Sequence, residues 1–399
     1  MTRAADPAGR GGDAGCDAGL AARADAGPVS VTVRSDDPHG AQALHAGLVA
    51  CDPALVLLFG SPRDALAPMA ERLHRLLPGV TLAGCSSAGE IGRDGYQRGT
   101  VLGIGFPRAT FRAGAVALRD QGDIPVSAWL AALRTLHADF VPDPRRAVFG
   151  ILLADGRSGH EDVLAAALDA ALPDVPIVGG SAGDGLDFGA TTQILDGRPV
   201  PGAAVFVLVE TALAVAEVSF AHFSPTEDRA VVTAADPHSG TILELNAEPA
   251  ADEYARLAGL DPAAMEPADF ASHPLLLRMG RRHHVRAISE ATAGRGLKLM
   301  SSIDTGTVLT LGRAEDVTQG FGAALDSLPQ PPLMVLGFDC ILRRLAVERA
   351  GMAGRMGSLF ARYRVAGFNT YGEQHAGMHV NQTFVGLALM PRADGDAAH

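Results

Sequence analysis

The feature that most constrains this sequence is a strand–helix–strand pattern that occurs twice, 95 residues apart. An apolar run at residues 55–59 is followed by a helix-like segment and then by a second apolar run, which ends in a Gly/Ser loop at Gly84. The same order recurs from residue 151, and 95 positions separate Gly84 from its counterpart Gly179. Strands that are buried on both faces have continuous apolar runs, so each copy predicts two such strands joined by a helix.

A third, weaker copy of this pattern lies near the C-terminus. Residues 333–338 form an apolar run, and residues 365–373 match residues 82–90 without a gap, with Gly and Glu at the same places in both segments. In the second copy, a deletion of one residue aligns Asp184 with Glu90. Gly-rich loops after strands are common, so convergent turn chemistry is the alternative to a shared architecture.

The three copies and the segments between them predict the fold class. We expect an α/β to α+β protein, in which an N-terminal α/β domain of two related strand–helix–strand units with mixed sheets is followed by an α+β C-terminal domain. Residues 220–233 form a polar connection, and we expect the boundary between the two domains near residues 222–240. Along the chain we expect a disordered tail at 1–27, an N-terminal domain at 28–225, a C-terminal domain at 226–391 and a disordered tail at 392–399.

Composition and charge exclude several classes of function. Lys plus Arg is 33 and Asp plus Glu is 45, giving a net charge of −12, so no basic face is expected for a nucleic-acid backbone. The longest apolar stretch, residues 203–220, is interrupted by Glu210 and Glu217, whereas a membrane-spanning helix needs about 20 apolar residues. The first residues contain no apolar signal segment. We therefore expect a cytoplasmic protein that binds neither nucleic acid nor a membrane.

The Gly/Ser loops are the candidate ligand-binding segments. Sheets of the α/β class place ligands at the carboxyl ends of their parallel strands, and Gly allows close approach of a backbone. The acids at the loop ends could bind an amine, or they could cap the next element. The loops match neither the P-loop nor the dinucleotide-binding fingerprint, so ATP and NAD have no motif here. The candidate loop residues are Gly84, Cys85, Ser86, Ser87, Glu90, Gly179, Ser181, Asp184, Asn369, Thr370, Glu373 and Asn381.

The thirteen histidines and four cysteines form no recognisable catalytic or zinc-binding pattern. The sequence has no Gly-x-Ser-x-Gly elbow, no C-x-x-C pair and no three-ligand zinc spacing. His375 and His379 are four positions apart, a spacing that puts two side chains on one face of a helix or of a strand. The alternative is that these histidines face solvent or are satisfied within the core. We expect a protein that is not an enzyme.

Taken in order, the loops resemble those of the FIST family, sensory proteins made of an N-terminal and a C-terminal FIST domain. The resemblance is carried by residues 82–91, 179–184, 367–373 and 381–383, and it covers nearly the whole chain from about residue 29. It implies a protein that binds small ligands, such as amino acids, and that signals to kinases or to cyclic-dinucleotide enzymes.

One branch of stand-alone FIST proteins is similar to this chain in length, and its members bind haem and sense nitric oxide. The resemblance therefore implies a haem-binding nitric oxide sensor that regulates a partner histidine kinase or a diguanylate cyclase/phosphodiesterase. Haem iron needs an axial ligand such as His, and we rank His379 first, followed by His375, His222 and His273. The alternatives are a FIST sensor of an amino acid or other metabolite without haem, and an enzyme of unrecognised class.

Overall fold

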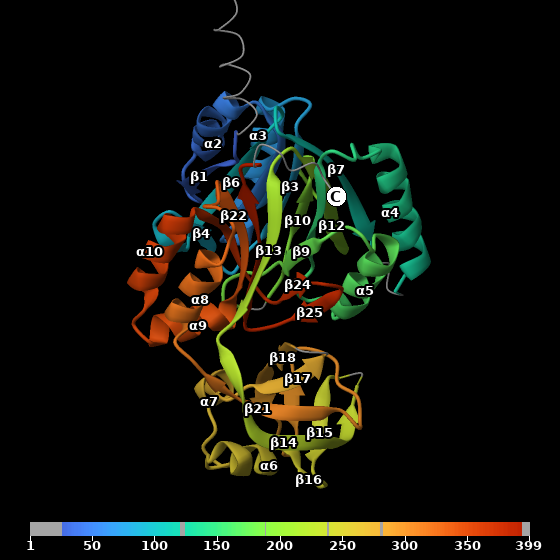
Figure 1. The fold of residues 1–399 in the computed structure, drawn as a ribbon, viewed down its shortest axis with the longest axis vertical. Helices are drawn as coiled ribbons and strands as arrows, with labels where there is room; N and C mark the ends of the chain where they lie inside the picture. The colour runs from blue at the N-terminus through green and yellow to red at the C-terminus, as the bar shows by residue number, and fades with distance from the viewer. Residues whose placement is uncertain (1–25, 120–123, 188, 238, 280–281, 393–399) are drawn as a thin grey trace, which may run out of the picture.

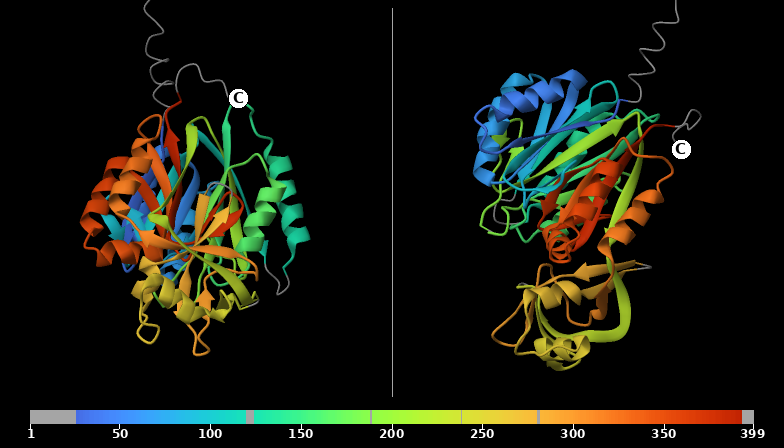
Figure 2. Two further views of the ribbon diagram at one scale, coloured as in Figure 1. Left: turned by 60° about the horizontal axis from the view of Figure 1, so that its bottom comes forward. Right: turned by 90° about the vertical axis from the view of Figure 1, so that its left-hand side faces the viewer.

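The computed structural model describes residues 26–119, 124–187, 189–237, 239–279 and 282–392. It contains a large body and a small lobe, joined by the long strand β14 and by the return segment that leads into helix α8 (Figure 1). Figure 2 shows β14 running from the body into the lobe. The two expected disordered tails lie almost entirely outside the described residues. Within the described part of the chain, none of the helices has the length and apolar character that a membrane crossing requires.

The body consists of three copies of one unit, each of which has an edge strand, a helix, a first strand, one or two further helices, a parallel second strand, a hairpin and a last strand. The first copy contains β1 (Val29–Arg34), α2 (Gly40–Leu48), η1 (Val49–Cys51), β2 (Pro53–Gly60), α3 (Arg63–Leu76), β3 (Thr81–Ser86), β4 (Glu90–Gly92), β5 (Gly95–Gln97) and β6 (Thr100–Pro107). The second contains β7 (Phe111–Arg119), α4 (Val126–Phe140), β8 (Ala147–Ala154), α5 (Glu161–Ala171), β9 (Ile177–Ser181), β10 (Gln193–Leu195), β11 (Arg198–Pro199) and β12 (Ala203–Thr211). The third contains β13 (Ala214–Ala221), α8 (Val317–Asp326), β22 (Met334–Cys340), α9 (Ile341–Arg349), α10 (Ala353–Tyr363), β23 (Val365–Thr370), β24 (Glu373–His375), β25 (Met378–Val380) and β26 (Thr383–Met390).

The three sheets of the body have the same strand order among the described residues. They run β1-β6-β2-β3-β10-β11, β7-β12-β8-β9-β24-β25 and β13-β26-β22-β23-β4-β5. In each sheet the first and second strands of the unit are parallel, and all other neighbours are antiparallel. The hairpin of each unit extends the sheet of another unit, so that β4–β5 joins the third sheet, β10–β11 the first and β24–β25 the second. This cyclic exchange ties the copies together, and the predicted mixed α/β fold is confirmed.

The core explains the continuous apolar runs of the sequence. Alternate side chains of the first strands, such as Leu57, Ile151 and Leu336, point inward and pack with those of the other two sheets. Their neighbours, such as Leu58 and Leu152, point outward and are covered by helices. Burial of one such side chain contributes about 1.5–3 kcal/mol, so both faces of each first strand stabilise the body. The prediction of strands buried on both faces is confirmed.

A glycine recurs in the second strand of each unit because two backbones approach closely there. A Cβ at Gly84 or Gly179 would lie 2.1 Å from a carbonyl oxygen of the paired first strand, and a Cβ at Gly367 would lie 1.7 Å from one. No side chain can occupy such a position without separating the strands. The repeated glycine of the sequence therefore reflects the close contact of the parallel strand pair.

The lobe interrupts the third copy between β13 and α8 and has a core of its own. Its elements are β14 (Phe223–Asp236), β15 (Thr241–Leu245), β16 (Glu248–Pro249), α6 (Ala250–Ala258), α7 (Pro267–Ser272), β17 (Leu275–Met279), β18 (Arg282–Arg286), β19 (Ile288–Ala291), β20 (Leu297–Leu299) and β21 (Val308–Ala314). Tyr254 and Phe270 from its helices pack onto its sheet. Toward the body, Leu276 and Val285 of the lobe pack against Leu342 of α9. The body and the lobe are thus held together by two chain crossings, a small apolar contact, and a hydrogen bond from Ser302 Oγ to Asp162 Oδ2 of α5 (3.2 Å).

Candidate functional site

The three Gly/Ser loops meet at the carboxyl ends of the parallel strands and hydrogen-bond to one another. Ala88 N donates to Asn369 O (2.9 Å), and Asn369 N donates to Gly89 O (2.7 Å), which joins the first loop to the third. The second loop is joined by hydrogen bonds from Gly183 N to Ser86 O (3.1 Å) and from Ser181 N to Gly372 O (2.8 Å). The expectation that the loops follow topologically similar strands is confirmed. Their role in ligand binding stays a prediction.

Two of the predicted loop acids, Glu90 and Glu373, are fully buried and surrounded by hydroxyl groups. Glu90 accepts hydrogen bonds from Ser61 Oγ (3.1 Å), Ser87 Oγ (2.5 Å) and Thr100 Oγ1, and Glu373 accepts them from Thr370 Oγ1, Thr383 Oγ1 (2.6 Å) and Thr383 N (3.2 Å). Burial raises the pKa of Glu90 to about 7 and that of Glu373 to about 8, although the hydroxyl donors act in the opposite direction. Each acid therefore fastens its own loop to other segments of the same unit, Glu90 to Ser61 and Thr100 and Glu373 to Thr383.

Asp184, the third predicted loop acid, does not occupy the corresponding place. In the sheet register Glu90 lies opposite Phe368 and Glu373 lies opposite Gly180, whereas the matching position of the second unit holds Gln193, opposite Cys85. The alignment of Asp184 with Glu90 was therefore wrong, because the second unit has a longer connection between its second strand and its hairpin. Asp184 lies in that connection and accepts hydrogen bonds from Tyr371 OH (2.8 Å) and Ala190 N (2.8 Å).

The other predicted loop residues are also buried and engaged within the protein. Burial raises the pKa of the Cys85 thiol well above its usual value, which keeps it protonated and unreactive. Ser181 Oγ accepts a hydrogen bond from Gln374 Nε2 (2.8 Å), and Asn369 Oδ1 accepts one from Arg344 Nη1 (2.9 Å). The centre of the loop cluster is therefore closed, and a ligand would have to bind at its edge.

The buried carboxyls predict that stability falls as the pH rises through neutrality. The pKa of Glu373 is raised from 4.5 to about 8, so the folded protein keeps a proton that the unfolded chain releases. Stability is therefore expected to fall as the pH rises toward 8 and to level off above it. Buried His222 and His379, whose pKa values are lowered, act in the opposite direction below about pH 6.5.

We expect the replacement Glu373→Gln to flatten this decline between pH 6.5 and pH 8, because an amide does not ionise. Thermal unfolding of the variant and of the unmodified protein at several pH values across that interval measures the difference. If the two proteins lose stability equally over the interval, Glu373 does not hold the proton.

A pocket of about 460 Å³ lies at the edge of the loop cluster, and its walls carry charges of both signs. Arg63 begins α3, directly after the end of β2, and Arg98 lies in the turn between β5 and β6. Arg63 pairs with Asp64 (3.2 Å). Partial burial would raise the pKa of Asp184, but hydrogen bonds from Ala190 N and Tyr371 OH hold it below its usual value. The pocket is lined by Ser61, Pro62, Arg63, Asp64, Ala88, Arg98, Gly99, Asp184, Gly185, Leu186 and Asp187.

Most of the charged residues of this pocket were missed by the sequence reasoning. Asp184 alone was among the predicted site residues, whereas Arg63, Arg98 and Asp187 were not. Arg63 could have been found from the sequence, because it lies three residues after the end of a buried strand. Ligand-binding residues of α/β sheets are found in such places. Arg98 gave no comparable signal, because it lies in the connection between β5 and β6, two strands that belong to different sheets.

Comparison with protein-family models supports the same assignment as the loops. The FIST N domain model matches residues 54–248, and the FIST C domain model matches residues 250–376. Together the two models cover most of the chain. It is a FIST-domain protein. FIST domains are sensory domains of signal transduction that bind small ligands. No curated protein matches the chain.

His375 and His379 of this FIST-domain protein do not share a face, contrary to the spacing argument. Ala376 and Gly377, with φ of 50° and 73°, form a tight turn between them, and such a turn joins the two strands of a hairpin. His375 therefore lies opposite Met378, while His379 lies opposite Gln374 on the other face. A four-residue spacing places side chains together only within one continuous helix or strand.

The four histidines that the resemblance to haem-binding FIST proteins singled out differ in their surroundings. His375 Nε2 lies 2.8 Å from Glu217 Oε2, and His273 Nδ1 lies 3.3 Å from Asp269 O. The two ring nitrogens of His379 lie 3.1 Å from Gln374 Nε2 and 3.5 Å from Asn381 Nδ2, so an iron atom there would displace an amide. Burial lowers the pKa of His379 to about 4.

His222 offers a better fit to haem iron than the other three. Burial lowers its pKa to about 3, which keeps the imidazole neutral, and its Nδ1 has no hydrogen-bond partner among the described residues. It lines a pocket of about 310 Å³ between the body and the lobe, whose walls are largely apolar. The pocket residues are His222, Ala268, Ala271, Ser272, Ala314, Glu315, Asp316, Val317, Ala346, Arg349, Ala350 and Met352.

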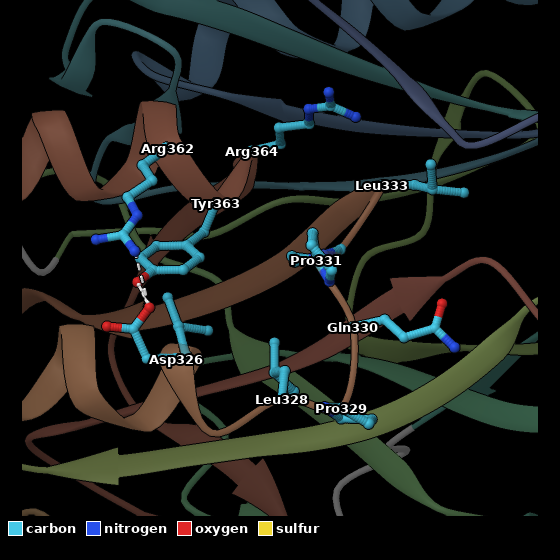
Figure 3. Close-up of a pocket in the computed structure, with 11 residues that line it drawn as sticks. Asp326, Leu328, Pro329, Gln330, Pro331, Leu333, Arg362, Tyr363 and Arg364 are labelled. Carbon is cyan, nitrogen blue, oxygen red and sulfur yellow. Dashed lines mark hydrogen bonds and ion pairs between the residues drawn. The ribbon is translucent and has the colours of Figure 1, made fainter.

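A further pocket, of about 510 Å³, lies at the opposite end of the FIST body. It is formed between the segment that precedes β22 and the end of α10 (Figure 3). Asp326 in its wall accepts hydrogen bonds from Arg362 Nη2 (2.9 Å) and Tyr363 OH (2.5 Å). Ligands of α/β sheets bind at the carboxyl ends of the parallel strands, so this pocket at their amino ends is not the candidate site.

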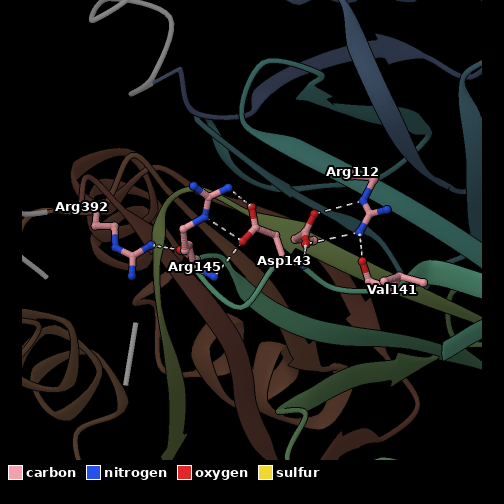
Figure 4. Close-up of polar contacts among 6 residues, drawn as sticks. Arg112, Val141, Asp143, Arg145 and Arg392 are labelled. Carbon is pink, nitrogen blue, oxygen red and sulfur yellow. Dashed lines mark hydrogen bonds and ion pairs between the residues drawn. The ribbon is translucent and has the colours of Figure 1, made fainter. Parts of the chain in front are cut away.

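At the amino ends of the parallel strands, polar contacts attach the connection between α4 and β8 to the second sheet (Figure 4). Buried Glu210 of β12 accepts hydrogen bonds from Arg112 Nε (3.0 Å) and from Asp143 N (2.5 Å). Arg145 pairs with Asp143 (2.9 Å), and Arg392 donates to the carbonyl oxygen of Arg145. These contacts tie the connection between α4 and β8 to the sheet, and we assign them a structural role.

Proposed function

We propose that this FIST-domain protein is a non-enzymatic sensor that binds a small zwitterionic ligand, such as an amino acid, at the edge of its loop cluster. The observation that carries the proposal is the 460 Å³ pocket with Arg63 and Arg98 on its walls together with Asp184 and Asp187. Guanidinium groups bind carboxylates, and carboxylates bind ammonium groups, through charge-assisted hydrogen bonds. A pocket with both kinds of group suits a ligand that carries both charges, and its volume lies within the range of small-molecule sites.

Replacing Arg63 by Ala is expected to weaken the binding of such a ligand about 10- to 100-fold, because a hydrogen bond to a charged group contributes about 1.5–3 kcal/mol. Isothermal titration calorimetry against the free amino acids measures the affinity. Arg75→Ala is the matched control, since Arg75 lies on the same helix, pairs with Glu71 (3.2 Å) and is not among the pocket residues. Absence of binding by every amino acid, or equal affinities for the two variants, would contradict the proposal.

Haem is the second candidate ligand, and its support is the resemblance to the nitric-oxide-sensing branch together with the neutral imidazole of His222. When bound, haem supplies an iron that takes nitric oxide. His222 would hold the iron, and Arg349 in the same pocket carries a charge that suits a propionate. An intense Soret band in the purified protein that is lost in His222→Ala supports this ligand, whereas loss in His379→Ala instead selects His379. Native far-UV circular dichroism of both variants is the control for folding.

The proposed output is the regulation of a partner histidine kinase or diguanylate cyclase/phosphodiesterase in the cytoplasm. A ligand can act on a partner only if it binds two conformations with different affinities. The junction between body and lobe is small, and the chain crosses it at Ala221–Phe223 and at Ala314–Val317, so a change of angle there is the expected conformational difference. The rates of kinase autophosphorylation, or of cyclic-di-GMP synthesis and hydrolysis, with and without ligand test this output. Equal rates, or turnover by this protein alone, would favour the enzyme alternative.

A further inference from the structure

A second pocket of the body occupies, in the second unit, the place that the charged pocket occupies in the first. β2 ends at Gly60 opposite Ser86, and β8 ends at Ala154 opposite Ser181, so that Asp155 follows its strand as Ser61 does. The other side of each pocket includes the glycine that precedes the last strand. These glycines are Gly99, with φ of 67°, and Gly202, with φ of 59°. The two pockets therefore share two equivalent positions of the repeated unit, the residue after the first strand and the glycine before the last strand.

In the third unit the equivalent position is covered by the lobe. Cys340 ends β22 there, and α9 begins at the next residue, Ile341. The following side chain, Leu342, packs against Leu276 and Val285 of the lobe.

The second pocket has a different chemistry from the first. Its volume is about 190 Å³, and its apolar walls are formed by Leu118, Trp129, Leu164, Ala203 and Ala204. The remaining lining residues are Asp155, Ser158, His160 and Gly202. Trp129 Nε1 donates to Arg119 O (2.9 Å), which satisfies the polar edge of the indole and leaves its ring as an apolar wall. The pocket combines an aromatic wall with a single carboxylate.

The carboxylate of Asp155 is fixed in place at one end of this pocket. Its Oδ1 accepts hydrogen bonds from Thr191 Oγ1 (2.5 Å) and from Arg157 N (3.1 Å). Buried Glu161 lies close by, and the charges of Asp155 and Asp162 add to burial in raising its pKa, while His160 acts more weakly in the opposite direction. The two acids outweigh the imidazole, which disfavours an anionic guest at this end of the pocket and favours a cation.

We propose that this second pocket binds a small primary amine with an apolar or aromatic body, at a site separate from the charged pocket. The ammonium group bonds to Asp155, and the apolar body lies against Trp129 and the two alanines of β12. A volume below the usual range for drug-sized ligands limits the guest to about one ring with a short aminoalkyl chain. A free amino acid is disfavoured, because its carboxylate would face Asp155. The protein would then respond to two ligands of different chemical class.

The single tryptophan of the chain makes this proposal directly testable, because Trp129 is the fluorescent residue that lines the pocket. Titration of the full-length protein with benzylamine is expected to change the tryptophan fluorescence saturably. Benzyl alcohol, which has a similar shape and no charge, is expected to bind at least about tenfold more weakly. Absence of a saturable change, or equal affinities for the amine and the alcohol, would overturn the proposal even without a variant.

Two matched variants separate this pocket from the charged one. In Asp155→Asn the amide oxygen can still accept from Thr191 and Arg157 N, so the fold is expected to persist while the preference for benzylamine over benzyl alcohol is lost. In Asp184→Asn, on the wall of the charged pocket, that preference is expected to remain. If Asp155→Asn keeps the preference, or Asp184→Asn loses it, the amine does not bind where we propose. Thermal unfolding of both variants is the control for folding.

Discussion

Replacing Gly367 by Ala is expected to destabilise the protein by more than about 4 kcal/mol, a large part of the 5–15 kcal/mol that typically separates folded from unfolded states. The added Cβ would lie 1.7 Å from the carbonyl oxygen of Gly337 and 2.7 Å from its carbonyl carbon. Both are backbone atoms of β22, so the clash can be removed only if the two parallel strands move apart. Their pairing in β22 extends from Val335 to Cys340, and its hydrogen bonds would be weakened. β23 also carries the exchanged hairpin of the first unit, so the damage spreads to a second copy.

Urea unfolding measures the loss in Gly367→Ala, and Gly354→Ala is the matched control. Gly354 lies near the start of α10, and a Cβ there would meet nothing within 4 Å. In a helix Ala is favoured over Gly by about 1 kcal/mol, so the control variant should be unchanged or slightly more stable. A Gly367→Ala protein within about 1 kcal/mol of the unmodified one would show that the two strands are not packed as described.

Replacing Arg343 by Met is expected to destabilise the protein by about 3–5 kcal/mol, because it leaves a buried carboxylate without its partner. Arg343 Nη1 lies 2.7 Å from Asp339 Oδ1, and both side chains are inaccessible to solvent. The guanidinium also lies over the ring of Phe321, 5.0 Å from its centre. After the replacement, the OH group of Tyr96, 2.5 Å from Asp339 Oδ2, would be the remaining hydrogen-bond donor to that carboxylate among the described contacts.

The double variant Asp339→Asn/Arg343→Met tests whether the unpaired charge causes the loss. It is expected to recover most of the stability, since a neutral amide needs no counter-ion and a buried ion pair adds little over well-packed neutral groups. Arg355→Met is the surface control, because its pair with Asp316 (3.5 Å) is largely exposed and should change stability by less than about 1 kcal/mol. A double variant that is no more stable than Arg343→Met would assign the loss to packing instead of charge.

The local elements of this protein followed from short-range patterns. Apolar runs such as residues 55–59 and 151–154 became strands buried on both faces, because each packs a central core on one side and helices on the other. The Gly-containing second strands and their loops were found for the same reason, since the close contact of two parallel backbones admits no other residue.

The failures concern residues whose environment is set by distant parts of the chain. Gln193, which occupies the place of Glu90 and Glu373, follows a connection of different length and could be identified only from the register of an exchanged hairpin. His375 and His379 were separated by a tight turn that a spacing rule ignores. Arg98 reaches the charged pocket from the connection between β5 of the third sheet and β6 of the first sheet.

The amino-acid sequence alone was sufficient for the strand–helix–strand segments, their recurrence and the family, because hydrophobic burial and glycine contacts act over a few residues. The cyclic exchange of hairpins, the closure of the loop cluster, and the different chemistry of the two equivalent pockets emerged only from the tertiary structure. The exchange of hairpins and the charged pocket depend on residues that are 90 or more positions apart, such as Arg63 and Asp184. Contacts over such separations are decided by how the sheets pack together, and no local pattern encodes that packing.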